Sequence, residues 1–201
     1  MSKPTQRDWD ALKRFARYLL GASRVIQLFE YQSKVKGINV WTDTDYAGCS
    51  KTRKSTSGGI VMHGTHLLKS WSSTQSVVAL SSGEAEYYGL VKGASIGLGI
   101  QSMFGDFGVS VELNLKSDAS AACGIARRRG LGKVRHIEVA QLWLQDLVSK
   151  GRVKIEKVPG TSNLSDILTK HVQQSDIAFH MEGVRMHIEG GRHHDMPAVA
   201  A

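Results

Sequence analysis

Four acidic residues stand where the chain passes from one predicted element to the next. Asp43 ends an alternating, strand-like stretch, and Asp118 follows a second one. Glu86 lies in the first turns of a long helical stretch, and Asp166 at the start of a short one. Crowded carboxylates repel one another unless cations neutralise them. Mg²⁺ prefers oxygen ligands, and two ions about 4 Å apart can hold both reacting oxygens of a phosphodiester. The four acids therefore indicate a two-metal phosphodiester site.

Each acid also has a purely structural interpretation. Asp43 and Asp118 could cap turns or helices, and Asp166 could stabilise the dipole of the last helix. A helix-capping pattern already accounts for Glu84. Asp45 lies two residues after Asp43 and can point to the same side of a strand, so periodicity alone does not choose between them.

The elements that must position these acids are read from hydrophobic periodicity and from turn signals. Amphipathic or capped stretches predict helices at 5–20, 82–104, 119–127, 136–150 and 163–171. Alternating stretches predict strands at 25–32, 37–43, 58–64, 66–72, 111–117 and 152–158. Strands that come first and then alternate with helices predict an α/β fold, a mixed sheet with helices on its faces. Ligand chemistry in such sheets lies at the carboxyl ends of strands.

Composition favours a soluble protein with a polyanionic partner. Lys and Arg number 26 against 18 Asp and Glu, a net charge of +8, which favours nucleic acid, although solubility alone also explains it. No apolar run approaches the roughly 18 residues of a membrane span, so we expect no membrane association. Cys49 and Cys123 form no CxxC pattern, which argues against a disulfide framework and suits an intracellular location.

Five ordered motifs resemble the ribonuclease H domain of copia-type LTR retrotransposon polyproteins. They are TDTDYAGCSKTRKSTSGG (42–59), SWSSTQSVVALSSGEAEYYGL (70–90), KSDASAA (116–122), VRHIEV (134–139) and KVPGTSNLSDILTK (157–170). The resemblance implies the ribonuclease H-like fold, a five-stranded mixed sheet with helices on both faces. It also implies cleavage of the RNA strand of RNA–DNA hybrids in reverse transcription. A catalytically inactive remnant that still binds the hybrid is the alternative.

Residue by residue, the resemblance places the metal-binding catalytic acids at Asp43, Glu86, Asp118 and Asp166, and so favours Asp43 over Asp45. It implies two Mg²⁺ ions, with Mn²⁺ as a substitute. Many ribonucleases H carry a histidine in the loop after the last strand, whereas the loop here, 159–163, has none.

Basic residues in two stretches are the candidates for holding the hybrid, because phosphate contacts give affinity with little sequence preference. A solvated surface is the plainer explanation for any single one of them. His136 has either a substrate-side role or a packing role at the start of its predicted helix. The predicted substrate-binding residues are Lys51, Arg53, Lys54, Arg127, Arg128, Arg129, Lys133, Arg135 and His136.

Three parts of the chain are expected. Residues 1–34 look like the end of a reverse transcriptase region, residues 35–172 form the ribonuclease H domain, and 173–201 lacks periodicity and is expected to be a flexible tail. The resemblance implies the reverse transcriptase part of the same polyprotein as a partner. It also implies a cytoplasmic (virus-like particle) or nuclear location.

Overall fold

A five-stranded mixed sheet forms the centre of the computed structural model, which describes residues 3–132, 136–137, 141–191 and 195. The strand order is β4 (His66–Thr74), β3 (Thr56–His63), β2 (Gly37–Thr44), β5 (Glu112–Ser117) and β6 (Val153–Lys157). The first three strands are antiparallel, and β2, β5 and β6 are parallel. This order and these directions are those of the ribonuclease H-like fold, so the predicted fold class is confirmed.

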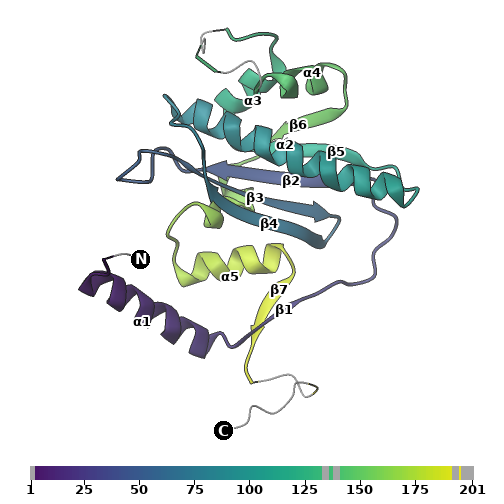
Figure 1. The fold of residues 1–201 in the computed structure, drawn as a ribbon. Coiled ribbons are helices and arrows are strands. Elements are labelled where there is room, and N and C mark those ends of the chain that lie inside the picture. Colours follow the sequence, from purple (N-terminus) through teal and green to yellow (C-terminus); the bar gives the residue numbers. More distant parts are fainter. Residues whose placement is uncertain (1–2, 133–135, 138–140, 192–194, 196–201) are drawn as a thin grey trace.

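Helices lie on both faces of the sheet (Figure 1). The helices α2 (Ser82–Asp106), α3 (Ser120–Arg127) and α4 (Trp143–Ser149) enclose the larger core on one face. On the other face, Ile60 and Met62 pack against Val184, at the end of α5 (Gln174–Gly183). None of the described helices is long and apolar enough to span a membrane.

The alternation along β2 decides which residues face which layer. Ile38 and Val40 are fully buried in the core beneath α2. Trp41, one residue on, packs with Ile60 and Met62 on the opposite face. Because side chains alternate along a strand, Asp43 points away from the apolar core under α2. The two-residue period therefore leaves the carboxylate available at the strand end.

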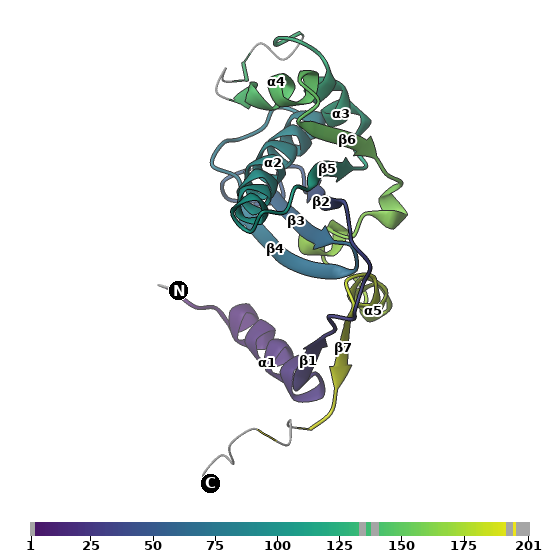
Figure 2. The same cartoon turned by 90° about the vertical axis from the view of Figure 1, so that its right-hand side faces the viewer.

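The two ends of the described chain meet in a second, two-stranded sheet (Figure 2). After α1 (Gln6–Gly21), the strand β1 (Arg24–Gln27) pairs antiparallel with β7 (Met186–Glu189). The strand predicted at 25–32 is thus shorter than expected. The prediction of an unstructured tail from residue 173 is wrong for α5 and β7, because β7 is held by a strand from the far end of the sequence. The proposed division of the chain into three parts stays a prediction.

Two predicted helices also differ from the structure. The helix expected at 136–150 begins only at Trp143; residues 138–140 of it lie outside the described residues. Within the helix expected at 163–171 the structure has one short 3₁₀ turn, η3 (Asp166–Leu168), and a second, η2 (Gly160–Ser162), lies just before it. There the Asn163 side chain accepts hydrogen bonds from the main chain and hydroxyl of Ser165. Such local bonds compete with helix formation.

Candidate active site

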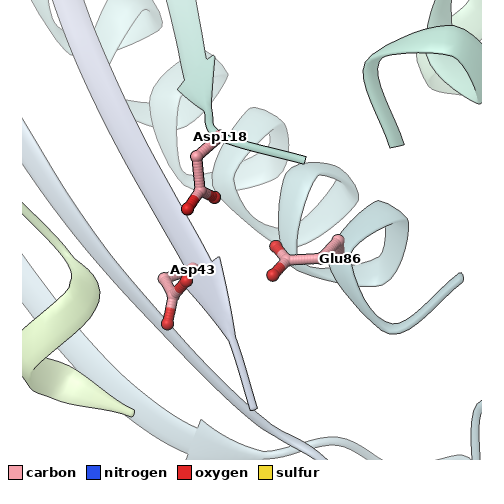
Figure 3. A group of neighbouring side chains, drawn as sticks. All are labelled: Asp43, Glu86 and Asp118. Carbon is pink, nitrogen blue, oxygen red and sulfur yellow. The ribbon is translucent and has the colours of Figure 1, made fainter. Parts of the chain in front are cut away.

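Three carboxylates converge at one edge of the main sheet (Figure 3). Asp43 lies near the end of β2, Asp118 directly follows β5, and Glu86 belongs to α2. One carboxylate oxygen from each lies within 4.8 Å of the others. We call these three residues the acidic cluster. The structure thus brings together three of the four acids that the sequence singled out.

The two aspartates meet because β2 and β5 are adjacent and parallel. Trp41 of β2 is paired with Lys116 of β5, close to the end of each strand. Parallel neighbours present their carboxyl ends at the same edge of a sheet, so Asp43 and Asp118 emerge side by side.

Glu86 reaches the acidic cluster because α2 packs closely against β2. A Cβ on Gly89 would lie 2.6 Å from Oγ1 of Thr44, and one on Gly93 would lie 2.6 Å from Cγ2 of Thr42. A larger residue at either position would have to displace these threonine side chains or move α2 away from β2. Glu86 lies one turn earlier, and its Oε1 accepts a hydrogen bond from the main-chain nitrogen of Thr44 at 3.3 Å.

Burial and mutual repulsion shape the electrostatics of the acidic cluster. Burial, with the charges of Asp43 and Asp118, raises the pKa of Glu86 to about 8. Burial also raises the pKa of Asp43, although Thr169 and Lys170 act in the opposite direction. Without a cation, the folded chain therefore resists full ionisation of this site.

The donor set fits a divalent cation. The Oε2 atom of Glu86 is buried and has no hydrogen-bond partner among the described residues. An unpaired buried carboxylate oxygen is costly. A hard cation with a preference for carboxylate oxygens would give this atom a partner and offset the repulsion. Asp43, Glu86 and Asp118 are thus the residues that would hold it.

Asp166 lies beside the acidic cluster but is engaged differently. It is the first residue of η3, which lies against β2 and β3, and its charge raises the pKa of Asp43. Its carboxylate is paired with Lys170. The metal-binding role of Asp166 therefore stays a prediction.

Thr169 and Lys170, the two residues that follow η3, were not predicted from the sequence to belong to the site. The Thr169 hydroxyl donates a hydrogen bond to Oδ2 of Asp43. The Lys170 ammonium lies 3.9 Å from the same oxygen. The available signal was the spacing of Asp166 and Lys170, four residues apart, which is typical of an ion pair on one helical turn.

Asp45, the alternative to Asp43, has a structural role. Its Oδ1 accepts a hydrogen bond from the main chain of Thr56, and its own amide donates to the Thr56 carbonyl. It thereby closes the loop between β2 and β3.

The first basic stretch lies in the loop between β2 and β3. Lys51 and Arg53 are exposed, and Lys54 is half-buried. Arg53 adopts a positive φ of 56° and donates its main-chain N–H to the Cys49 carbonyl. The substrate contacts of these residues stay predictions.

The second basic stretch follows α3. The Arg127 guanidinium donates to a main-chain carbonyl of β6 at 2.7 Å, and Arg128 donates to a carbonyl of its own loop. Arg129 is exposed. Lys133 and Arg135 lie outside the described residues. Arg127 and Arg128 thus have intramolecular partners, and Arg129 is the described member of this stretch most open to a phosphate.

His136 is bound to a buried carboxylate. Its Nε2 lies 2.6 Å from Oε2 of Glu84, whose side chain is only 2% exposed. Glu84 also accepts from the Tyr88 hydroxyl and from the Leu80 main chain. The expected capping box is only half formed: the Ser81 hydroxyl accepts from the Glu84 main chain, and the Glu84 carboxylate bonds elsewhere. This contact favours a supporting role for His136.

The short loop after β6 closes over the acidic cluster. A Cβ on Gly160 would lie 3.1 Å from Oδ2 of Asp118, so glycine permits this approach. Asn163 is fully buried, and its amide donates to the Thr42 carbonyl at 3.0 Å. The loop is therefore fastened to β2 beside Asp43.

No family model matches the chain. It is 26% identical over 189 residues to the retrovirus-related Pol polyprotein from transposon TNT 1-94 of Nicotiana tabacum, covering 93% of this chain and 14% of that protein. It is 30% identical over 183 residues to the corresponding polyprotein from transposon RE2 of Arabidopsis thaliana, covering 89% of this chain and 12% of that protein. The chain is therefore similar in sequence to one segment of retrovirus-related Pol polyproteins.

The Pol homologues are much longer than this chain, which corresponds to one segment of each. Among solved structures, LC11-RNase H1 in complex with an RNA/DNA hybrid is similar, at a TM-score of 0.43 and 18% identity. That match covers 65% of this chain and 92% of the other. The fold assignment itself rests on the strand order and directions described above.

Proposed function

We propose that this chain is the ribonuclease H region of a copia-type retrotransposon Pol polyprotein and hydrolyses the RNA strand of RNA–DNA hybrids. The proposal includes two-metal-ion catalysis with Mg²⁺, or Mn²⁺ as a substitute, at Asp43, Glu86, Asp118 and Asp166. The observation that carries it is the convergence of three carboxylates within 4.8 Å from three separate elements.

The residues of the acidic cluster have distinct parts in this proposal. Bound divalent ions would supply an activated water and neutralise charge on the leaving oxygen. Asp43 and Asp118 are fixed at the ends of paired strands, so their oxygens hold a constant spacing. One oxygen of Glu86 accepts a hydrogen bond from the Thr44 main chain, which fixes its orientation, and the other has no partner among the described residues.

Substrate binding would rely on charge rather than on base contacts. The net charge of +8 and the exposed Lys51, Arg53 and Arg129 favour a phosphate backbone. Recognition of RNA against DNA would depend on 2′-hydroxyls in the shallow minor groove.

The proposal also includes the partner of this chain and its location. The Pol homology supports the reverse transcriptase region of the same polyprotein as a partner, next to residues 1–34. A virus-like particle in the cytoplasm, or the nucleus, would be its location.

One assay tests the function. Labelled RNA–DNA hybrid, double-stranded RNA and double-stranded DNA are each incubated with the chain and Mg²⁺. We expect cleavage of the hybrid alone, and its loss in Asp118→Asn. Asp146→Asn is the matched control, because the Asp146 carboxylate is exposed and pairs with the exposed Lys150 on α4, away from the acidic cluster. Binding of the hybrid without cleavage by the unmodified chain would instead support the inactive remnant.

A further inference from the structure

A positively charged side chain already stands at one side of the proposed metal site. The Lys170 ammonium is paired with the Asp166 carboxylate and lies 3.9 Å from Oδ2 of Asp43. Both acids belong to the proposed metal-binding set. A cation is thus present between them before any metal binds.

The two sides of the proposed metal site therefore differ in the partners of their carboxylate oxygens. On one side, Glu86 has a buried oxygen without a partner among the described residues. On the other, Asp43 receives the Thr169 hydroxyl and the Lys170 charge. A lysine ammonium is ordinarily charged at neutral pH.

The Lys170 side chain can also move away from the proposed metal site. Its side chain is 49% exposed, and lysine is a compact charge on a flexible four-carbon stem. Rotation into solvent breaks its ion pairs with Asp166 and Asp43. A divalent cation carries twice the charge of the ammonium and can bind several carboxylate oxygens at once, so it can displace Lys170.

We propose that Lys170 is a built-in counter-ion that competes with the second divalent cation for Asp43 and Asp166. The first cation binds at Asp43, Glu86 and Asp118, and the second binds once Lys170 has turned away. This inference rests on the proposed function in one respect, that Asp166 is a metal ligand.

The test is a titration of the whole chain with Mn²⁺ alone, without substrate, followed by calorimetry and by the electron paramagnetic resonance of free Mn²⁺. Lys170→Met removes the competing charge at nearly constant length, so we expect the second Mn²⁺ to bind about tenfold more tightly. Lys170→Arg keeps the charge and should bind Mn²⁺ like the unmodified chain. Lys150→Met is the matched control, because it breaks another exposed i,i+4 pair, with Asp146, away from the site.

Two results would overturn the inference. Equal affinity for Mn²⁺ in Lys170→Met and the unmodified chain would show that Lys170 does not compete. Weaker binding in Lys170→Met would show that it holds Asp166 in place for the metal. Thermal unfolding gives an independent readout: Lys170→Met should melt below the unmodified chain without metal and not below it at saturating Mn²⁺. A constant difference in melting temperature would also count against competition.

Hybrid cleavage, measured in parallel, separates this inference from the proposed function. Cleavage by the unmodified chain with no gain in Mn²⁺ affinity for Lys170→Met refutes the inference alone. A gain in affinity without cleavage by any variant refutes the function alone.

Discussion

The edge of the main sheet and the first helix are built in opposite ways. At the edge, Asp43 and Glu86 are buried and α2 lies so close to β2 that Gly89 and Gly93 have no room for a Cβ. In α1 no residue is buried, and Phe15 is 57% exposed. Both ribbon views place α1 beside β1 and β7 and apart from the five-stranded sheet (Figures 1 and 2).

Because of this difference, the two regions should respond very differently to substitutions and to solution conditions. Dense packing around charged groups makes the edge depend on pH, on metal and on single methyl groups. In contrast, the stability of the chain should depend little on side chains of the exposed helix α1. Three measurements can sharpen or break this contrast, and the largest effect is expected at the acidic cluster.

The free energy of unfolding of the metal-free chain should fall as the pH rises from about 4.5 to about 8. Glu86 has a folded pKa of about 8 against an ordinary value of 4.5. Between these values the folded state keeps a proton that the unfolded state has lost, so stability decreases with pH. Below about 4.5 both states are protonated, and above about 8 both are ionised. Each pKa unit corresponds to about 1.4 kcal/mol, so the loss between pH 4.5 and pH 8 is on the order of 5 kcal/mol.

Glu86→Gln is the control for this pH effect, because the amide has nearly the same shape and cannot ionise. Urea unfolding at several pH values should show a flatter profile for the variant than for the unmodified chain. Saturating Mg²⁺ should restore stability to the unmodified chain at pH 8. Parallel profiles for the two proteins would contradict the burial of an ionisable group at this position.

The next effect is expected from a single methyl group on α2. Gly93→Ala places a Cβ 2.6 Å from Thr42, whereas Gly99→Ala meets nothing within 4 Å. Alanine is the better helix former by about 1 kcal/mol. We expect Gly99→Ala to stabilise the chain by about 0.5–1 kcal/mol and Gly93→Ala to destabilise it by about 1–2 kcal/mol. Denaturant midpoints of the two variants measure the difference, and a gain in both would mean that α2 can move away from β2.

Local patterns in the sequence predicted the edge well. The two-residue period of 37–43 places Ile38 and Val40 inward and leaves Asp43 on the opposite face, as observed. The long helix with Glu86 near its start was also confirmed. These features follow from the order of residues within one element.

Features that depend on distant pairing were not predicted. The strand β7 is four residues long and is defined by its partner, with Arg24 opposite Glu189. The contact of Lys170 with Asp43 depends on how η3 lies against β2, which no local pattern encodes. The hydrogen bond from the Asn163 amide to the Thr42 carbonyl likewise joins residues far apart in the sequence.

The smallest effect is expected on α1, from Phe15→Ser. Phenylalanine and serine have similar helix propensities, and an exposed side chain removes little area from water. The free energy of unfolding should change by less than about 0.5 kcal/mol, and hybrid cleavage should be unchanged. Leu90→Ala, at a fully buried position of α2, should cost about 2–5 kcal/mol in the same experiment. A loss above about 1 kcal/mol in Phe15→Ser would exceed what an exposed side chain supports. It would mean that α1 packs against the rest of the chain in solution and is less different from the acidic cluster than the structure indicates.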